Sequence, residues 1–264
     1  MTELRFVQVD AFADRPFTGN AAAVIPLDSW LPDDTLQAIA MENNLSETAF
    51  TIPSGDGEAD SELRWFTPTT EVALCGHATL ASGHVLIGAR ERVRFRTRKA
   101  GILVVARDGD ALALDLPAVP VRPFPPDSRL AESLGDEGAL FRSTGGAEDT
   151  AIVLLEDEAA VRACAPDMRR LREIELMVIV TAPGAGGHDV VSRVFVPAWG
   201  VDEDPVTGSA HAALTPFWAE RLGRDSFTAF QASRRGGLVH CRAAGERVIL
   251  GGQCVTVIEG LMHI

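Results

Sequence analysis

The chain has 264 residues, 46% of them hydrophobic, and carries a formal net charge of −13 at pH 7. This length and composition suit one large domain or two ordinary ones with sizeable cores. The negative charge argues against nucleic acid and an anionic membrane surface as partners. No basic and apolar leader opens the chain, and no apolar run reaches the ~20 residues of a membrane helix. We therefore expect a cytoplasmic protein that does not associate with membranes.

The first half of the chain predicts strands and one amphipathic helix. Residues 4–12 and 21–25 are rich in apolar residues and predict well-covered strands. The acidic residues after Pro32 would cap a helix, which Asn43 and Asn44 would end because Asn tolerates the left-handed conformation. A strand over residues 45–52 follows, with Glu47 at its start.

The second half predicts a similar alternation after a Pro-rich stretch, residues 117–126, which is typical of an interdomain connector. Strands near 152–155 and 176–180 flank one short helix over about residues 159–171. A strand over residues 190–196 leads into an acidic loop at 202–205. Residues 207–209 then open an Ala-rich helix that Pro216 should kink.

Two stretches of the chain share one plan, which indicates a two-fold repeat. Phe66-Thr67-Pro68 matches Phe195-Val196-Pro197, and Cys75-Gly76-His77-Ala78 matches Thr207-Gly208-Ser209-Ala210 after a short insertion. Many short strands with one small-residue helix per half predict an α+β fold with largely antiparallel sheets. We expect repeat domains at 1–118 and 119–264, with the last strand able to cross to the first domain.

Four blocks carry a resemblance to a known family: residues 19–24 (GNAAAV), 44–50 (NLSETAF), 74–79 (LCGHAT) and 203–209 (EDPVTGS). In this order they resemble the PhzF, or phenazine biosynthesis-like, family. The resemblance implies a fold like that of diaminopimelate epimerase, with two pseudo-symmetric domains that each wrap a sheet around a central helix. It also implies an active site in the cleft between them, usually in a homodimer.

Glu47 is the candidate proton carrier. A carboxylate whose pKa burial raises toward neutrality can take a proton from one carbon and return it to another. From the residues alone, a solvated carboxylate at a helix exit is the simpler interpretation. The resemblance favours the catalytic one, because the family's Asn-Leu-Ser-Glu-Thr glutamate acts as general acid and base.

His77 lies in the first turn of the first repeat's helix, where the positive helix end should favour a neutral imidazole. Such a ring can donate and accept hydrogen bonds, which suits proton relay, although a histidine that caps the helix fits equally well. The resemblance implies that His77 and Asp204 assist proton transfer. It also implies that Ser209, Gly76, Gly208 and Asn20 bind the substrate.

Cys75 bears on a competing interpretation. Cofactor-independent epimerases of this fold use two facing cysteines, but the repeat places Thr207 opposite Cys75, and a threonine hydroxyl is too weak a base to replace a thiolate. We therefore interpret Cys75 as a small buried residue. The late segment 231–237 resembles a family block that begins Gln-Gly, but Ala232 stands in place of the glycine.

The sequence lacks the motifs of metal binding, of dithiol redox chemistry, of serine hydrolysis and of nucleotide binding. The histidines show no metal-ligand spacing, the cysteines form no C-x-x-C, and Ser209 has no nucleophile elbow. No glycine-rich phosphate loop follows a strand. We expect no metal and no cofactor.

Together these expectations describe a cofactor-independent isomerase that moves a proton between carbons of a small unsaturated or amino-substituted carboxylic acid, resembling trans-2,3-dihydro-3-hydroxyanthranilate isomerase. An amino-acid epimerase of the same fold and a non-catalytic small-ligand-binding protein are the alternatives.

Overall fold

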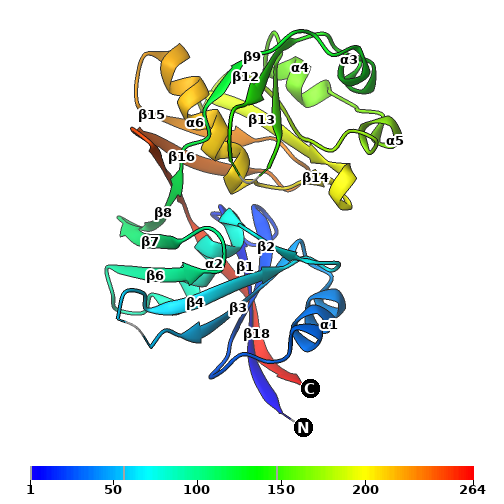
Figure 1. Ribbon diagram of the computed structural model, residues 1–264. Helices are drawn as coiled ribbons and strands as arrows, with labels where there is room; N and C mark the ends of the chain where they lie inside the picture. Colours follow the sequence, from blue (N-terminus) through cyan, green and yellow to red (C-terminus); the bar gives the residue numbers. More distant parts are fainter. Residues whose placement is uncertain (1, 56, 147) are drawn as a thin grey trace. The chain divides into compact units, whose positions relative to one another are not determined.

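The computed structural model describes residues 2–55, 57–146 and 148–264. The chain divides into two compact units, Met1–Leu116 with Gly251–Ile264, and Pro117–Leu250 (Figure 1). No helix in the described ranges is long and apolar enough to cross a membrane.

The first unit combines a mixed sheet with two helices. Its elements are β1 (Glu3–Ala11), β2 (Asn20–Pro26), α1 (Asp33–Asn43), β3 (Glu47–Pro53), β4 (Ser61–Phe66), β5 (Glu71–Val72), α2 (Gly76–Leu86), β6 (Arg92–Thr97), β7 (Ile102–Asp108), β8 (Ala111–Pro117) and β18 (Cys254–His263).

The second unit has the same kind of sheet and more short helices. Its elements are β9 (Val121–Pro123), α3 (Ser128–Leu134), β10 (Ala139–Ser143), β11 (Thr150–Leu154), α4 (Glu158–Ala163), α5 (Met168–Leu171), β12 (Met177–Pro183), β13 (Val190–Val196), a 3-10 helix (Pro197–Trp199), β14 (Val201–Asp204), α6 (Gly208–Leu222), β15 (Ser226–Gln231), β16 (Gly237–Ala244) and β17 (Arg247–Gly252).

The strand pairing confirms the predicted two-fold repeat. In the first unit β1–β2 is antiparallel, β2–β3 parallel, β3–β4 and β4–β5 antiparallel, β4–β6 parallel and β6–β7 antiparallel. The pairs β10–β11, β11–β12, β12–β13, β13–β14, β13–β15 and β15–β16 follow the same order of directions. The α+β class is thus correct, with parallel pairs inserted into largely antiparallel sheets.

The helix α2 is the centre of the first unit. It contacts β1, β2, β3, β6, β7 and β18, and every residue from Gly76 to Gly83 is buried. Small residues permit this packing, because a Cβ at Gly83 would collide with the Val105 side chain on β7. The buried hydroxyls of Thr79 and Ser82 donate to helix carbonyls one turn earlier, which satisfies them without a partner outside the helix.

The other face of the first sheet is covered by α1. Leu36 and Ile39 of this helix pack with Phe50 and Phe66, whose rings meet edge to face at 5.6 Å. Asn44 ends α1 in the left-handed conformation at φ 48°, as its residue type predicts. This turn leads directly to Glu47, the first residue of β3.

Two local predictions for the second unit are wrong. The expected helix at 159–171 is two helices, α4 and α5, because Pro166 between them lacks the N–H that a continuous helix needs. The expected acidic loop contains the short strand β14, which pairs with β13. The expected connector, residues 117–126, begins at the boundary between the two units, and it also contains the short strand β9, which pairs with β10.

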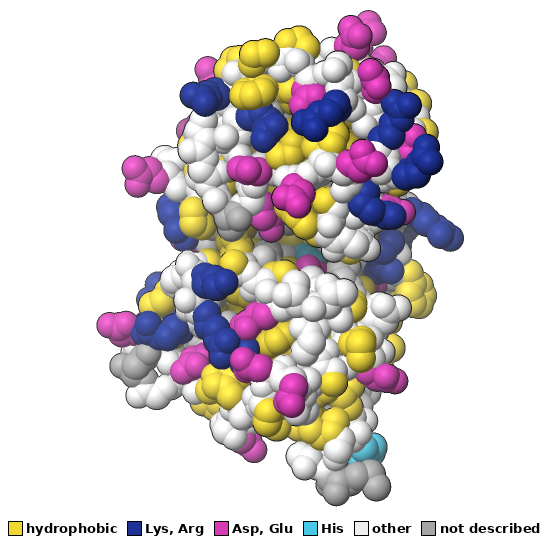
Figure 2. Space-filling model, turned by 45° about the vertical axis from the view of Figure 1, so that its right-hand side comes forward, with side chains coloured by type: hydrophobic (Ala, Val, Ile, Leu, Met, Phe, Trp, Pro, Cys, Tyr) yellow, Lys and Arg dark blue, Asp and Glu magenta, His cyan; other side chains and the backbone are white. Residues whose placement is uncertain are grey.

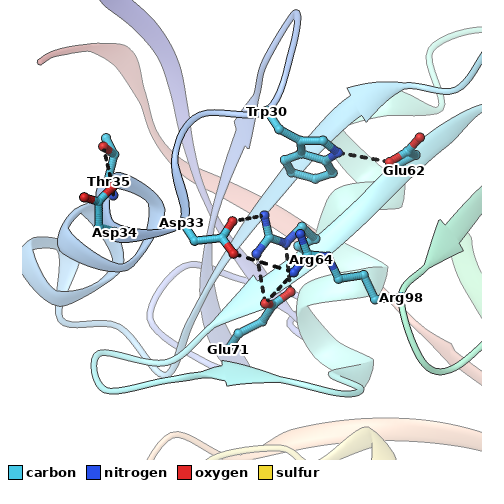
Figure 3. A network of polar contacts seen from close by, with 8 residues as sticks. All are labelled: Trp30, Asp33, Asp34, Thr35, Glu62, Arg64, Glu71 and Arg98. Atoms are coloured by element: carbon cyan, nitrogen blue, oxygen red, sulfur yellow. Dashed lines mark hydrogen bonds and ion pairs between the residues drawn. The ribbon is translucent and has the colours of Figure 1, made fainter.

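A buried arginine connects three elements of the first unit. Arg64 on β4 is 2% exposed and donates two hydrogen bonds of 2.8 Å to the carboxylate of Glu71 on β5 (Figure 3). A third hydrogen bond, also 2.8 Å, goes to Asp33 at the start of α1. The guanidinium also lies over the rings of Trp30 and Phe66, at 5.1 and 4.9 Å from their centroids.

The second unit repeats this arrangement. Arg193 on β13 donates to both carboxylate oxygens of Glu203 on β14, at 2.7 and 3.0 Å, and lies 5.0 Å from the centroid of Phe195. Each bidentate pair fastens the short strand that precedes the central helix to the longer strand beside it. Most other charged side chains lie at the surface, where acidic and basic groups are interspersed (Figure 2).

The first prediction concerns Arg64. Arg64→Gln should lower the free energy of unfolding by about 3 kcal/mol, because it removes a buried guanidinium that is paired with two carboxylates. Arg98→Gln is the matched control: Arg98 also binds Glu71, at 3.1 Å, but is 53% exposed, so its loss should cost about 1 kcal/mol or less. Urea denaturation at pH 7 measures both, and equal small losses would contradict the assignment.

The same pair has a defined pH dependence. Hydrogen bonding to Arg64 holds the pKa of Glu71 below its ordinary value of 4.5. A carboxylate whose pKa is lowered in the folded state contributes stability that is fully present above its ordinary pKa. That contribution is lost as the pH falls through the folded-state pKa. The difference between wild type and Arg64→Gln should therefore shrink in acid.

Candidate active site

The start of α2 carries the first group of candidate residues. Cys75 is the N-cap in an extended conformation, and no side chain caps the helix. The free N–H groups of the first turn therefore remain available to an acceptor. His77 lies in this turn and is 3% exposed.

Glu47 reaches His77 from β3. Its Oε2 lies 3.2 Å from Nε2 of His77, within ion-pair distance. Both atoms are buried, yet neither makes a directed hydrogen bond with the described residues. Each of the two side chains thus has one buried polar atom beside the other that is not satisfied by a directed hydrogen bond.

Asn20, the first residue of β2, orients the other side of the imidazole. Its Nδ2 lies 3.1 Å from Nδ1 of His77, and its Oδ1 accepts a hydrogen bond from the Ser46 hydroxyl at 3.2 Å. An amide nitrogen only donates, so Nδ1 accepts in this arrangement. The proton of a neutral ring then lies on Nε2, beside Glu47.

The pKa of His77 shifts in the direction opposite to the expectation. Burial lowers the pKa of the imidazole, but its polar neighbours, the Glu47 carboxylate among them, raise it well above its usual value. This direction opposes the predicted preference for a neutral ring. A carboxylate 3.2 Å away acts on the ring more strongly than the partial charge of a helix end.

Both arguments place a proton on Nε2. The charged ring carries a second proton on Nδ1, which requires the Asn20 amide to turn so that its oxygen faces the ring. Glu47 therefore lies beside the N–H group at Nε2 whether the ring is neutral or charged. The ring can gain or lose the proton on Nδ1 while Nε2 stays next to the carboxylate.

Cys75 lies beside this pair as a neutral thiol. Its Sγ is 3.6 Å from Nδ1 of His77. Burial, together with the charge of Glu47, raises its pKa to about 11. The thiol is thus almost entirely protonated near neutral pH, which agrees with its interpretation as a small buried residue and makes it a poor base.

The start of α6 carries the second group of candidate residues. Asp204 ends β14, and its Oδ2 accepts a hydrogen bond of 2.5 Å from the hydroxyl of Thr207, the N-cap of α6. Gly208 and Ser209 form the first turn. Within the described residues the Ser209 hydroxyl donates only a long contact of 3.9 Å to Sδ of Met177, so its hydrogen-bonding capacity is largely unused.

Gln231 supports this second group and was not among the candidate residues. Its fully buried amide accepts from the Thr207 N–H at 2.9 Å and donates to the Asp204 carbonyl at 2.7 Å. These bonds hold the turn that carries Asp204. The available sequence signal was the resemblance of segment 231–237 to a family block.

The repeat shows which positions of the two groups are equivalent. Glu47 is the first residue of β3, and Met177 is the first residue of the matching strand β12. Likewise His77 and Ser209 are each the second residue of their helix, after the N-caps Cys75 and Thr207. The contact of a carboxylate with an imidazole therefore has no counterpart at the equivalent positions of the second unit, which hold Met177 and Ser209.

Known proteins resemble the chain along its whole length. Residues 9–260 match the profile of the PhzC-PhzF family, described as phenazine biosynthesis-like protein. A Pseudomonas aeruginosa protein named as an uncharacterized isomerase is 48% identical over 99% of this chain and 100% of its own. A solved PhzF-family structure from Enterococcus faecalis is 39% identical, with a TM-score of 0.91 and full coverage of both chains.

The epimerase fold is also shared. A hydroxyproline epimerase from Agrobacterium vitis has a TM-score of 0.63 at 15% identity and covers 98% of this chain and 92% of its own, which is a likeness of fold. The family profile and the relatives together establish the expected membership. The chain belongs to the PhzC-PhzF, phenazine biosynthesis-like family and is an isomerase.

Proposed function

We propose that the chain is a cofactor-independent isomerase that moves a proton between two carbons of a small unsaturated or amino-substituted carboxylic acid. The compound trans-2,3-dihydro-3-hydroxyanthranilate is the first substrate to test, since the family resemblance implies it. We also propose a cytoplasmic homodimer, on the same resemblance.

The observation that carries the proposal is the contact between Glu47 and His77. Glu47 Oε2 and His77 Nε2 are 3.2 Å apart and buried, and neither makes a hydrogen bond with the described residues. A buried polar atom without a partner is costly, so such a pair is typical of a site that a ligand completes.

In the proposed reaction Glu47 is the proton carrier. Its carboxylate takes a proton from one carbon of the substrate, and the electron pair of the broken C–H bond forms a new double bond to the neighbouring carbon. The electrons of the original double bond move to its far carbon, which takes the proton back from the protonated Glu47. The proton on Nε2 of His77 stabilises the negative charge that develops on the substrate, because a fixed donor needs no reorganisation during the reaction.

The second group of residues would bind and orient the substrate. The Ser209 hydroxyl and the N–H groups at Gly76 and Gly208 suit a carboxylate, since they lie at starts of helices. We propose that Asp204, held by Thr207 and Gln231, orients the substrate or assists proton transfer. Asn20 would act through His77.

Replacing Glu47, the proposed proton carrier, should strongly slow turnover. In deuterated water, wild-type protein should introduce deuterium into the substrate as it isomerises, because a carboxylate exchanges its proton with solvent. Glu47→Gln should be slower by about 10²–10⁴-fold. Proton NMR of the substrate follows both rate and labelling. The exposed Glu42→Gln on α1 is the control and should keep wild-type activity. An active Glu47→Gln would disprove the role.

The pKa values of the two histidines of α2 should be shifted in opposite directions from the ordinary value. The pKa of His77 should lie above 6.5, whereas burial lowers the pKa of His84. Glu47→Gln should lower the pKa of His77 because it removes the nearby negative charge, and should leave His84 unchanged. NMR titration of the imidazole protons, assigned with His77→Gln, measures this. A His77 pKa at or below 6.5 would argue against the ion pair.

A test against the epimerase alternative uses Cys75. With a pKa of about 11 and full burial, its thiol should resist iodoacetamide at pH 8 in the folded protein and react after unfolding in urea. Mass spectrometry of the peptide that contains Cys75 reports both states. Rapid alkylation of the folded protein, together with racemisation of an amino acid, would favour the two-base epimerase.

A further inference from the structure

Each polar group of Thr207, the N-cap of α6, has a partner. Its backbone N–H donates to Oε1 of Gln231 at 2.9 Å, and its carbonyl accepts from Nδ1 of His211 at 2.8 Å. Its hydroxyl oxygen lies 3.2 Å from Nε2 of Gln231 and 2.5 Å from Oδ2 of Asp204. Thr207, Gln231 and His211 are all buried. A residue bonded on every side in this way has little freedom to turn.

The direction of the hydrogen bonds follows from the backbone groups that Gln231 contacts. Its Oε1 accepts from the Thr207 N–H, and its Nε2 donates to the Asp204 carbonyl at 2.7 Å, so the orientation of the amide is fixed. The second proton of Nε2 then goes to the Thr207 hydroxyl oxygen. The hydroxyl has one proton of its own, which is left for Oδ2 of Asp204. The donors therefore run in one direction, from Gln231 through Thr207 to Asp204.

His211 holds the other backbone group of the N-cap. Burial lowers the pKa of His211 to about 4, so its ring is neutral near pH 7. Its one ring proton lies on Nδ1, because the Thr207 carbonyl can only accept. The turn that carries Thr207 thus keeps this anchor at neutral pH.

These bonds determine how Asp204 can act. A hydrogen bond donated to a carboxylate favours its ionised form. A donor that is itself held by Gln231 and by the backbone cannot follow the carboxylate if it rotates, so the carboxylate is fixed in direction as well. Asp204 is thereby set up as an acceptor, of a hydrogen bond or of a proton, and not as an acid.

The first unit shows that the fold does not require this chain of bonds. Strand pairing and the helix N-cap identify the equivalents of Asp204, Thr207 and Gln231 in that unit: Val72, Cys75 and Thr97. Valine has no polar side chain, and the Thr97 hydroxyl donates to the carbonyl of Gly101 instead. The same strands and central helix form around these residues, so the bonds of the second unit point to a role in the site.

We propose that Thr207 is a positioning residue of the isomerase, whose hydroxyl, directed by Gln231, holds the carboxylate of Asp204 as an acceptor that faces the substrate. This inference rests on the proposed function, because it gives Asp204 a task in that reaction. Thr207 itself acts only through Asp204. The N-cap that carries a neutral thiol in the first unit carries in the second a hydroxyl that orients a carboxylate.

Steady-state kinetics of matched variants test the role. Thr207→Val keeps the shape of the side chain but removes the hydroxyl. It should lower kcat by about 10²-fold and leave KM unchanged, because a misdirected group costs that much after the substrate is bound. Thr207→Ser retains the hydroxyl and should restore most of the rate. Thr215→Val is the control and should keep wild-type kcat, since this buried hydroxyl donates within α6, to the carbonyl of His211.

A double variant separates positioning from a general loss of structure. If Thr207 acts through Asp204, then adding Thr207→Val to Asp204→Asn should not lower the residual kcat further. A full additive loss in the double variant would overturn the proposal, and so would wild-type kcat in Thr207→Val. Equal melting temperatures of Thr207→Val and Thr207→Ser would show that the difference between them is not a loss of fold.

Crystal structures of the variants make the test independent of turnover. The Asp204 carboxylate should keep its wild-type direction in Thr207→Ser and turn away in Thr207→Val. An unchanged carboxylate in Thr207→Val would overturn the proposal, whether or not a substrate is known. Failure of the wild type to turn over any small acid would instead count against the proposed function, and the crystal structures would still decide the role of Thr207.

Discussion

The paired arginine and glutamate of each unit are the interaction on which the rest of the structure depends. Arg64 with Glu71, and Arg193 with Glu203, fasten the short strand before a central helix to the sheet. Because that strand leads within a few residues to Cys75 or Thr207, the pair determines where the helix begins. Bidentate geometry matters here, since a single point charge would leave the short strand free to rotate.

The two units show how one architecture acquires chemistry at a single place. Their strand order and arginine pairs agree, but Glu47 and His77 correspond to Met177 and Ser209. The scaffold that holds a carboxylate and an imidazole in one unit holds a thioether and a hydroxyl in the other. Stability and reactivity are thus carried by different residues, so the site can change without disturbing the sheet that supports it.

Much of this could be predicted from the sequence. The repeat was visible because helix starts and strand ends require particular small and apolar residues, and Asn44 ended its helix as expected. The contact of Glu47 with His77 could not be predicted from spacing, because it depends on the parallel pairing of β2 with β3 around α2. The effect of Glu47 on the pKa of His77 depends on the same pairing. The strand β14 was missed because pairing with β13 overrides the loop preference of its acidic residues.

The strand β18 gives the first unit an unusual order of assembly. Residues 254–263 pair with β1 along its length, although the whole second unit lies between them in the chain. During synthesis the unit that is begun first is therefore completed only after the second unit has been made, and the edge of β1 that pairs with β18 stays unpaired until then. Such an edge is a template for pairing with other chains. Protection of the nascent β1 is a requirement that this topology places on the cell.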